Sequence, residues 1–161
     1  MPIIATDIKV YLSTNGLAGA ITGTQLTDNT LHNLFAKVSA AEAVAGSTKY
    51  RAVFFKNEHA TLTYEAIKAY IEEQTPSTDT SVEVGVAVEG KNASIEAIAN
   101  EDTAPATVTF TATTTPASGA DVEDLAPTDY IGIWVKRIVS ASATAYSADY
   151  GKIATLGESA A

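Results

Sequence analysis

The chain has no cysteine, a single methionine, a single tryptophan and few basic side chains. The lack of cysteine excludes disulfides and thiolate metal sites. No apolar run approaches the roughly 20 residues that a helix needs to cross a bilayer, so we expect no membrane partner. Residues 1–30 lack a basic start followed by a long apolar stretch, which argues against a secretory signal and for synthesis in the cytoplasm.

Basic residues are too few to favour binding to nucleic acid. Ten lysines and arginines oppose nineteen acidic residues, and the formal net charge is -9. Binding to a phosphate backbone depends on a surplus of cations, so we expect no nucleic-acid partner. The cations that cluster in sequence are expected to pair with nearby carboxylates or to lie over apolar surface. These are Lys49, Arg51, Lys56, Lys136 and Arg137.

Alternating apolar residues are the most informative pattern that is present. Valine occupies every second position from Val82 to Val88, which predicts a strand with one apolar face. Further strands are predicted at residues 8–12, 50–55, 107–111 and 131–139, with weaker candidates at residues 95–98 and 150–156. Loops rich in Gly, Ser, Thr and Pro separate them, at residues 13–23, 75–80, 113–120 and 140–148.

This pattern predicts an all-β fold. A chain of 161 residues suits one domain, whose core is large enough to be stable without disulfides or structural metal ions. We expect an antiparallel two-sheet β-sandwich of about eight strands, immunoglobulin-like or jelly-roll-like, over residues 1–161. Met1, Pro2, Ile3 and Ile4 form a short apolar tip that packs on its own domain or against a partner. Residues 157–161 are expected to fray.

Residues 28–46 have two interpretations. Leu31, Leu34, Phe35 and Val38 fall at helical spacing, with Asp28 as a possible N-cap and Gly46 as a stop. A strand through residues 34–38 with a flanking turn is the preferred alternative.

Residues 61–73 are also ambiguous. Tyr64, Ile67, Tyr70 and Ile71 would form a helical stripe, whereas Ile67, Ala69 and Ile71 would line one face of a strand. The strand is favoured, and it would pair back across a turn at residues 57–59.

A short segment before the tryptophan strand resembles a tyrosine corner. Leu125, Pro127 and Tyr130 match in kind and spacing the corner of fibronectin-III and immunoglobulin-like sandwiches, in which the tyrosine hydroxyl bonds the chain a few residues upstream. This resemblance supports a sandwich and implies nothing about function.

No residue pattern predicts catalysis. His32 and His59 are the only histidines, and neither lies in a zinc-binding motif. There is no nucleophile elbow, phosphate-binding loop or dinucleotide fingerprint. We therefore expect no enzyme, no cofactor and no metal site. Calcium binding at acidic loops stays an alternative. The acidic residues concerned are Glu101, Asp102, Asp121, Glu123, Asp124 and Asp129.

Three segments resemble blocks of small virion structural proteins of tailed bacteriophages. The longest is residues 48–63, in which a strand ends in Lys56-Asn57 and turns through His59-Ala60-Thr61-Leu62. The others are Ile133-Trp134-Val135-Lys136-Arg137 and the opening strand over residues 7–13. The resemblance implies a packed β-fold that works by assembly, and it carries over no active-site residue.

The resemblance implies a virion location and protein partners. The interior of a capsid is filled with polyanion, so a chain of charge -9 is expected outside it, after synthesis in the host cytoplasm. We expect a decoration or cement protein that contacts the major capsid protein through its tip and strand edges. It would act as a homo-oligomer, with a trimer as one alternative. A tail, neck or baseplate component is the alternative. A carbohydrate-binding or adhesin module is the second alternative, with Tyr146 and Tyr150 as the tyrosines expected to be exposed.

Overall fold

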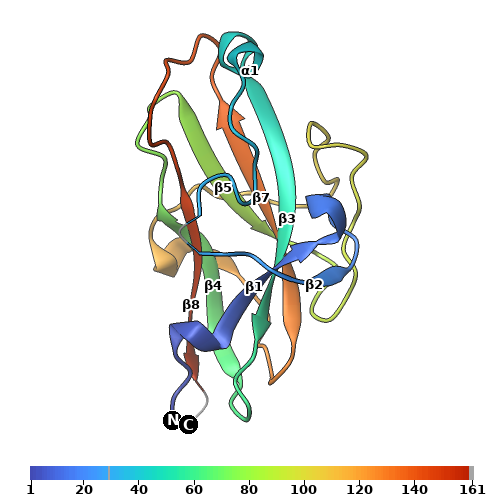
Figure 1. Cartoon of the computed structure of the whole chain (residues 1–161). Helices are drawn as coiled ribbons and strands as arrows, with labels where there is room; N and C mark the ends of the chain where they lie inside the picture. Colours follow the sequence, from blue (N-terminus) through green and yellow to red (C-terminus); the bar gives the residue numbers. More distant parts are fainter. Residues whose placement is uncertain (29, 160–161) are drawn as a thin grey trace.

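Two antiparallel β-sheets pack face to face in the computed structural model, which describes residues 1–28 and 30–159 (Figure 1). The larger sheet has the order β2-β1-β3-β7-β5 and the smaller the order β6-β4-β8. This confirms the prediction of an all-β, two-sheet sandwich with eight strands in the described residues. The strands are β1 (Ile8–Ser13), β2 (Ile21–Gln25), β3 (Ser47–Asn57), β4 (Tyr64–Glu73), β5 (Thr80–Val86), β6 (Ala120–Asp121), β7 (Tyr130–Val139) and β8 (Lys152–Ser159).

The helical elements are short. They are the 3-10 turns η1 (Ala5–Asp7), η2 (Thr14–Gly16) and η3 (Pro116–Ser118) and one α-helix, α1 (Ala40–Ala45). Figure 1 shows α1 at one end of the sandwich and the N-terminus together with the end of β8 at the other. The long axis therefore separates the helix from the apolar tip.

Strands β3 and β7 form the centre of the larger sheet, as their apolar composition predicts. They pair over ten residues, from Ser47↔Val139 to Lys56↔Tyr130. Both faces of this pair are buried, because Val53 and Ile133 point between the two sheets and Phe54 and Trp134 point to the other side. A strand that is buried on both faces needs apolar residues at successive positions.

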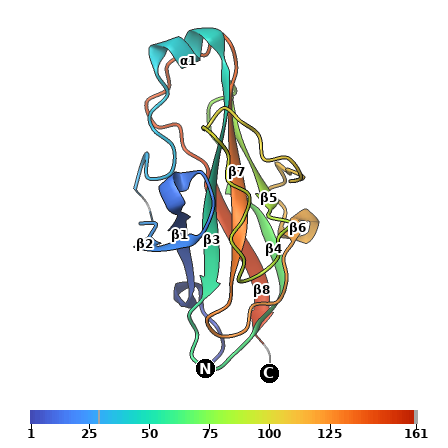
Figure 2. The ribbon, with the colours of Figure 1, turned by 90° about the vertical axis from the view of Figure 1, so that its right-hand side faces the viewer.

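The larger sheet has a second core on its outer face. Trp134 and Phe54, both fully buried, lie there under Ile95 and Ile98. Figure 2 looks onto this face, where the segment between β5 and η3 crosses in front of β7. Gly85 permits the close approach, since a Cβ there would lie 2.4 Å from a methyl group of Val108. The outer face of β5, opposite the face that its valines occupy, is therefore covered at Gly85 by the segment that contains Val108.

The strands expected at residues 95–98 and 107–111 are wrong. Each segment makes a single bridge, Gly19↔Ile95 and Val84↔Thr111, and no continuous ladder follows, although the Ile98 N–H also donates to the Leu17 carbonyl at 3.1 Å. Their apolar residues cover the outer core instead of pairing in a ladder. Alternation records which side chains are buried, and an irregular segment that lies across a sheet can bury the same ones.

The preferred strand through residues 34–38 is also wrong. Turns and irregular backbone occupy residues 31–39, and α1 follows. The N-cap is Ser39 rather than Asp28, because Ser39 and Glu42 form a capping box in which each side chain accepts the other's backbone N–H. The predicted stop is confirmed, since Gly46 ends the helix with φ 76°. Leu34 and Phe35 pack against the core between the sheets.

Residues 64–73 form strand β4, so the favoured strand is confirmed, with Ile67, Ala69 and Ile71 buried. Its expected pairing is wrong: β4 joins the other sheet, between β6 and β8. The link between β3 and β4 is thus an arch from one sheet to the other.

Asn57 holds this arch and is fully buried. Its side-chain N–H groups donate to the carbonyls of Leu62, at 2.8 Å, and Leu125, at 2.9 Å. Its side-chain oxygen accepts from the backbone N–H of His59 at 2.9 Å. These bonds replace the ladder that a hairpin would need and turn the chain out of the larger sheet.

Two element boundaries differ from the sequence prediction. The loop expected over residues 13–23 ends early, since β2 begins at Ile21. The expected fraying is wrong for residues 157–159, which belong to β8, where Gly157 lies close to the Tyr64 ring. Residues 160–161 of that prediction lie outside the described residues.

The tyrosine corner does not form as predicted. The Tyr130 hydroxyl donates to the carbonyl of Asn92 at 3.2 Å, which is far upstream rather than a few residues away. Leu125 is buried and bridges Tyr64, while Pro127 lies in the tight turn that brings Asp129 N–H to the Ala126 carbonyl. The turn therefore ties the two sheets together without the corner bond.

Replacing Asn57 with alanine should destabilise the fold by roughly 2–4 kcal/mol, because it leaves the half-buried Leu62 carbonyl and His59 N–H without this partner and the buried Leu125 carbonyl with only the Tyr64 N–H. Urea unfolding followed by tryptophan fluorescence measures this loss. Asn100→Ala is the matched control, since Asn100 is exposed and bonds only its own turn. Equal losses in the two variants would contradict the role given to Asn57.

Candidate contact surfaces

The apolar tip is divided between exposed and packed residues. Met1, Pro2 and Ile4 are exposed, Met1 fully and Ile4 at 57 %, whereas Ile3 packs against the core between the sheets. The Asp7 carboxylate accepts the backbone N–H of Ile4 at 2.9 Å and so holds the turn η1 in place. Ile3 anchors the segment while Ile4 faces outward. The tip thus presents an apolar surface that is fixed to the domain.

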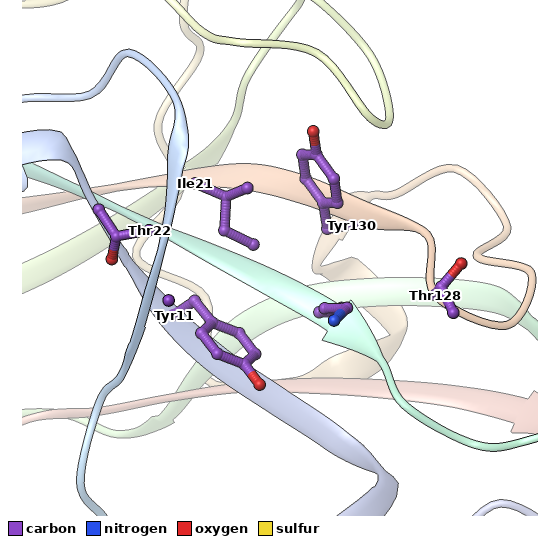
Figure 3. A pocket seen from close by; sticks show the side chains of 7 residues that line it. Tyr11, Ile21, Thr22, Thr128 and Tyr130 are labelled. Atoms are coloured by element: carbon purple, nitrogen blue, oxygen red, sulfur yellow. The ribbon is translucent and has the colours of Figure 1, made fainter.

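A shallow groove of about 410 Å³ is lined by residues of β2, β1, β3 and β7, neighbouring strands of the larger sheet, and by Thr128 (Figure 3). Tyr11 and Tyr130 lie on either side of Ile21, and their hydroxyls point away from each other. Thr22, Gly23, Lys56 and Thr128 complete the lining. Aromatic faces beside hydroxyl groups are a surface on which sugars can stack, so this groove is a candidate ligand site that the sequence did not predict. Its residues come from distant segments, and no local pattern marks them.

The groove contains a fixed polar group. The Tyr11 hydroxyl donates to the Glu58 carboxylate at 2.5 Å, and Lys56 lies 3.2 Å from the same oxygen. This hydrogen bond raises the pKa of Tyr11, with partial burial adding to it. The same bond, with the Lys56 charge adding to it, lowers the pKa of Glu58 despite partial burial. The three groups satisfy one another, so they position the ring of Tyr11 rather than offer a free acid or base.

The tyrosines expected to be exposed are exposed, Tyr146 at 55 % and Tyr150 at 37 %. The Tyr150 hydroxyl donates to Glu73 at 3.4 Å, and Lys152 lies 5.6 Å from its ring centroid. Tyr146 lies in the loop before β8, four residues before Tyr150.

The clustered cations are paired with carboxylates, as expected. Lys49 bridges Glu42 at 3.2 Å and Glu101 at 3.3 Å. Arg137, 9 % exposed, donates to Glu42 at 2.9 Å and to the Ala36 carbonyl at 2.7 Å. Arg51 also pairs with Glu101. This network joins the outer ends of β3 and β7 to α1 and to the segment that precedes it, so its role is structural.

The histidines and acidic loops do not converge. His59 caps its own turn, since its Nδ1 accepts the N–H groups of Thr61 and Leu62. His32 is exposed in a turn with φ 60°. In residues 1–28 and 30–159, no three His, Asp or Glu side chains come together as metal ligands. Over the same residues, no helix has the length and apolar character to span a membrane.

No family model, curated protein or solved structure matches this chain. Its own residues and surfaces are therefore the basis on which a function can be proposed.

Glu42 should make stability depend on pH. Partial burial raises the pKa of Glu42, but hydrogen bonds with Ser39 and Lys49 and the charge of Arg137 outweigh it, and the pKa falls from 4.5 to about 2. A pKa that is lowered on folding stabilises the protein above the unfolded value, by roughly 3 kcal/mol here, and the effect disappears as pH falls from about 4.5 to 2.

The measurement is urea unfolding of the wild type and Glu42→Gln at several pH values. The gap in unfolding free energy between them should be largest above pH 5 and close by about pH 2. Glu96→Gln is the control carboxylate, since Glu96 is half-buried and its carboxylate accepts only a backbone N–H, that of Ala106. A gap for Glu42→Gln that stays constant with pH would contradict the assignment.

Proposed function

We propose that this chain is a non-enzymatic structural protein of a tailed-bacteriophage virion, which decorates and stabilises the outside of the capsid by contact with the major capsid protein. The observation that carries the proposal is the position of the three segments that resemble virion proteins. They form β1, β3 with its following turn, and β7, which are adjacent strands of one sheet. The resemblance therefore covers one continuous structural unit rather than scattered residues.

The surface charge supports an exterior position. Nearly all lysines and arginines are paired with carboxylates, and Lys9 and Lys37 are the exceptions within the described residues. The unpaired remainder of the surface is therefore acidic. Such a surface is repelled by packaged DNA and suits the outer side of a shell.

The exposed tip supports attachment through protein contact. The N-terminus lies at the end of the sandwich opposite α1 (Figures 1 and 2), and both Met1 and Ile4 are exposed. An exposed apolar group that is fixed to a rigid domain costs little entropy to bury against a partner. Repetition on a capsid lattice multiplies such a weak contact into strong attachment.

The test is the copy number of the chain in purified virions, by quantitative mass spectrometry against the major capsid protein. A decoration protein should be present in hundreds of copies. A handful of copies would overturn the capsid assignment in favour of the tail, neck or baseplate, and absence from the particle would overturn both.

Ile4→Asp should weaken attachment to shells at least about tenfold without lowering the melting temperature, because Ile4 is exposed in the isolated domain. Val44→Asp is the matched control, since Val44 is 73 % exposed on α1 at the opposite end. Binding of the purified variants to shells that lack this chain, measured by co-sedimentation, separates the two. Equal loss in both variants would contradict attachment through the tip.

The groove beside Tyr11 and Tyr130 favours carbohydrate binding as a second candidate function. A glycan screen tests it, with Tyr130→Ala as the variant that should lose any hit. A screen without a hit on a chain present in many copies per virion would dismiss this candidate.

A further inference from the structure

Strand β8 has an unpaired outer edge. It bonds β4 on one side, and within residues 1–28 and 30–159 no other backbone hydrogen bond reaches residues 152–159. The other edges are protected. Strand β5 is bridged at Val84 by Thr111, β6 has two residues, and β2 has five, with a register shift against β1. Short or irregular edges resist pairing, so β8, with eight residues, is the edge that can accept another strand.

The free edge of β8 is regular. Two register shifts separate β4 from β8, one between Glu65 and Lys68 and one between Ile71 and Glu73. In each case the extra residue belongs to β4, since Glu65 and Lys68 face Glu158 and Leu156, which are only two apart. Bulges that blunt an edge are thus absent from β8 itself, and its alternation is unbroken.

The side chains of β8 alternate between the core and solvent. Thr155 and Gly157 face inward, where Thr155 lies 3.5 Å from the Tyr64 hydroxyl and Gly157 lies against the Tyr64 ring. The residues between them face outward, and Leu156 is 54 % exposed. The outward set is Lys152, Ala154, Leu156 and Glu158. A lysine and a glutamate thus stand at the two ends of an apolar centre.

We propose that β8 pairs antiparallel with β8 of a second copy of this chain, about a twofold axis at Thr155. In this register Lys152 of each copy faces Glu158 of the other, and Ala154 faces Leu156. The contact contains two ion pairs and covers both exposed leucines. A parallel pairing in register would place lysine against lysine and glutamate against glutamate, and like charges directly opposite destabilise a sheet. The charge pattern therefore favours a second copy as the partner, the antiparallel direction and the register centred on Thr155.

Within one copy, Glu158 stands opposite a second carboxylate. Glu65 is its partner in the β4–β8 ladder. Two like charges in directly opposite positions are unfavourable, and nothing in the described residues places a cation between them. Lys152 is bonded to Glu73 of its own copy at 2.6 Å, so Lys152 of the second copy would bridge that Glu73 and Glu158 across the contact. This inference goes beyond the proposed function and does not depend on it, because the contact needs only two copies in solution.

The test uses sedimentation velocity on the full chain over a range of concentrations. The wild type should show a reversible monomer–dimer equilibrium. Glu158→Lys and Lys152→Glu each place like charges opposite each other, so each variant alone should dimerise about tenfold or more weakly. A mixture of the two variants restores both ion pairs, and it should form a heterodimer as readily as the wild type forms its dimer.

Two controls separate the contact from the fold. Glu158→Lys places a lysine opposite Glu65, so its melting temperature at high dilution should not fall. Asp102→Lys changes an exposed carboxylate in the segment between β5 and η3, away from β8, and should leave the dimer unchanged. These controls show whether a lost dimer comes from the contact itself.

Three results would overturn the proposal. One is a wild type that stays monomeric up to about 1 mM, a concentration at which even weak contacts are populated. Another is a dimer that neither single variant weakens, since the contact would then lie elsewhere. The third is a variant mixture that stays as monomeric as its components, because the register would then be wrong.

Discussion

The satisfied hydrogen-bonding groups of Asn57 determine how the sandwich is connected. Its side chain joins the end of β3, the turn at His59 and the segment at Leu125, and its backbone bonds Asp129 and Thr128. A buried amide with all its groups paired tolerates little rearrangement, because each lost bond leaves a buried polar group without a partner. The Asn57 side chain therefore stabilises the arch through which β4 enters the second sheet, where β4 pairs with β8.

This connection divides the molecule into a central unit and a set of surfaces. The central unit is β1, β3 and β7, of which β3 and β7 are buried on both faces and tied at one end by the ion pairs of Glu42 with Lys49 and Arg137. The surfaces are the apolar tip before β1, the groove on the larger sheet at Tyr11 and the edge of β8 in the smaller sheet.

The two proposed contacts place different demands on the surface. The tip offers apolar area fixed by Ile3 and Asp7, which suits a partner that supplies its own groove. Strand β8 offers main-chain groups and a charge pattern that complements itself, which suits another copy. The tip and the last residues of β8 lie at the same end of the molecule (Figure 1). A dimer joined through β8 would carry two tips.

Several elements were determined by the sequence alone. The period-two patterns at residues 8–12 and 82–88 and the continuous apolar runs at residues 50–55 and 131–139 each led to a strand, because side chains on a strand alternate between the two faces of a sheet. The valine strand is shorter than predicted, since β5 ends at Val86 and Val88 is exposed. The exposed tyrosines and the pairing of the clustered cations were also predicted, but only Lys49 and Lys56 have a carboxylate partner nearby in the sequence. The carboxylate partners of Arg51, Lys136 and Arg137 lie in distant segments. Ser39 and Glu42 already have the spacing of a capping box in the sequence, and this spacing is the local signal that marks the start of α1.

Only the tertiary structure decided which strands pair. Residues 95–98 and 107–111 have strand patterns, yet they lie across the outer core because the neighbouring edge offers each of them a single bridge. The Tyr130 hydroxyl found Asn92 rather than its own turn, and β4 left the partner that the preceding turn suggested. The groove and the β8 edge could not be predicted for the same reason, since each depends on contacts between residues far apart in the chain. A local sequence pattern indicates which side chains are buried, but it does not identify their neighbours.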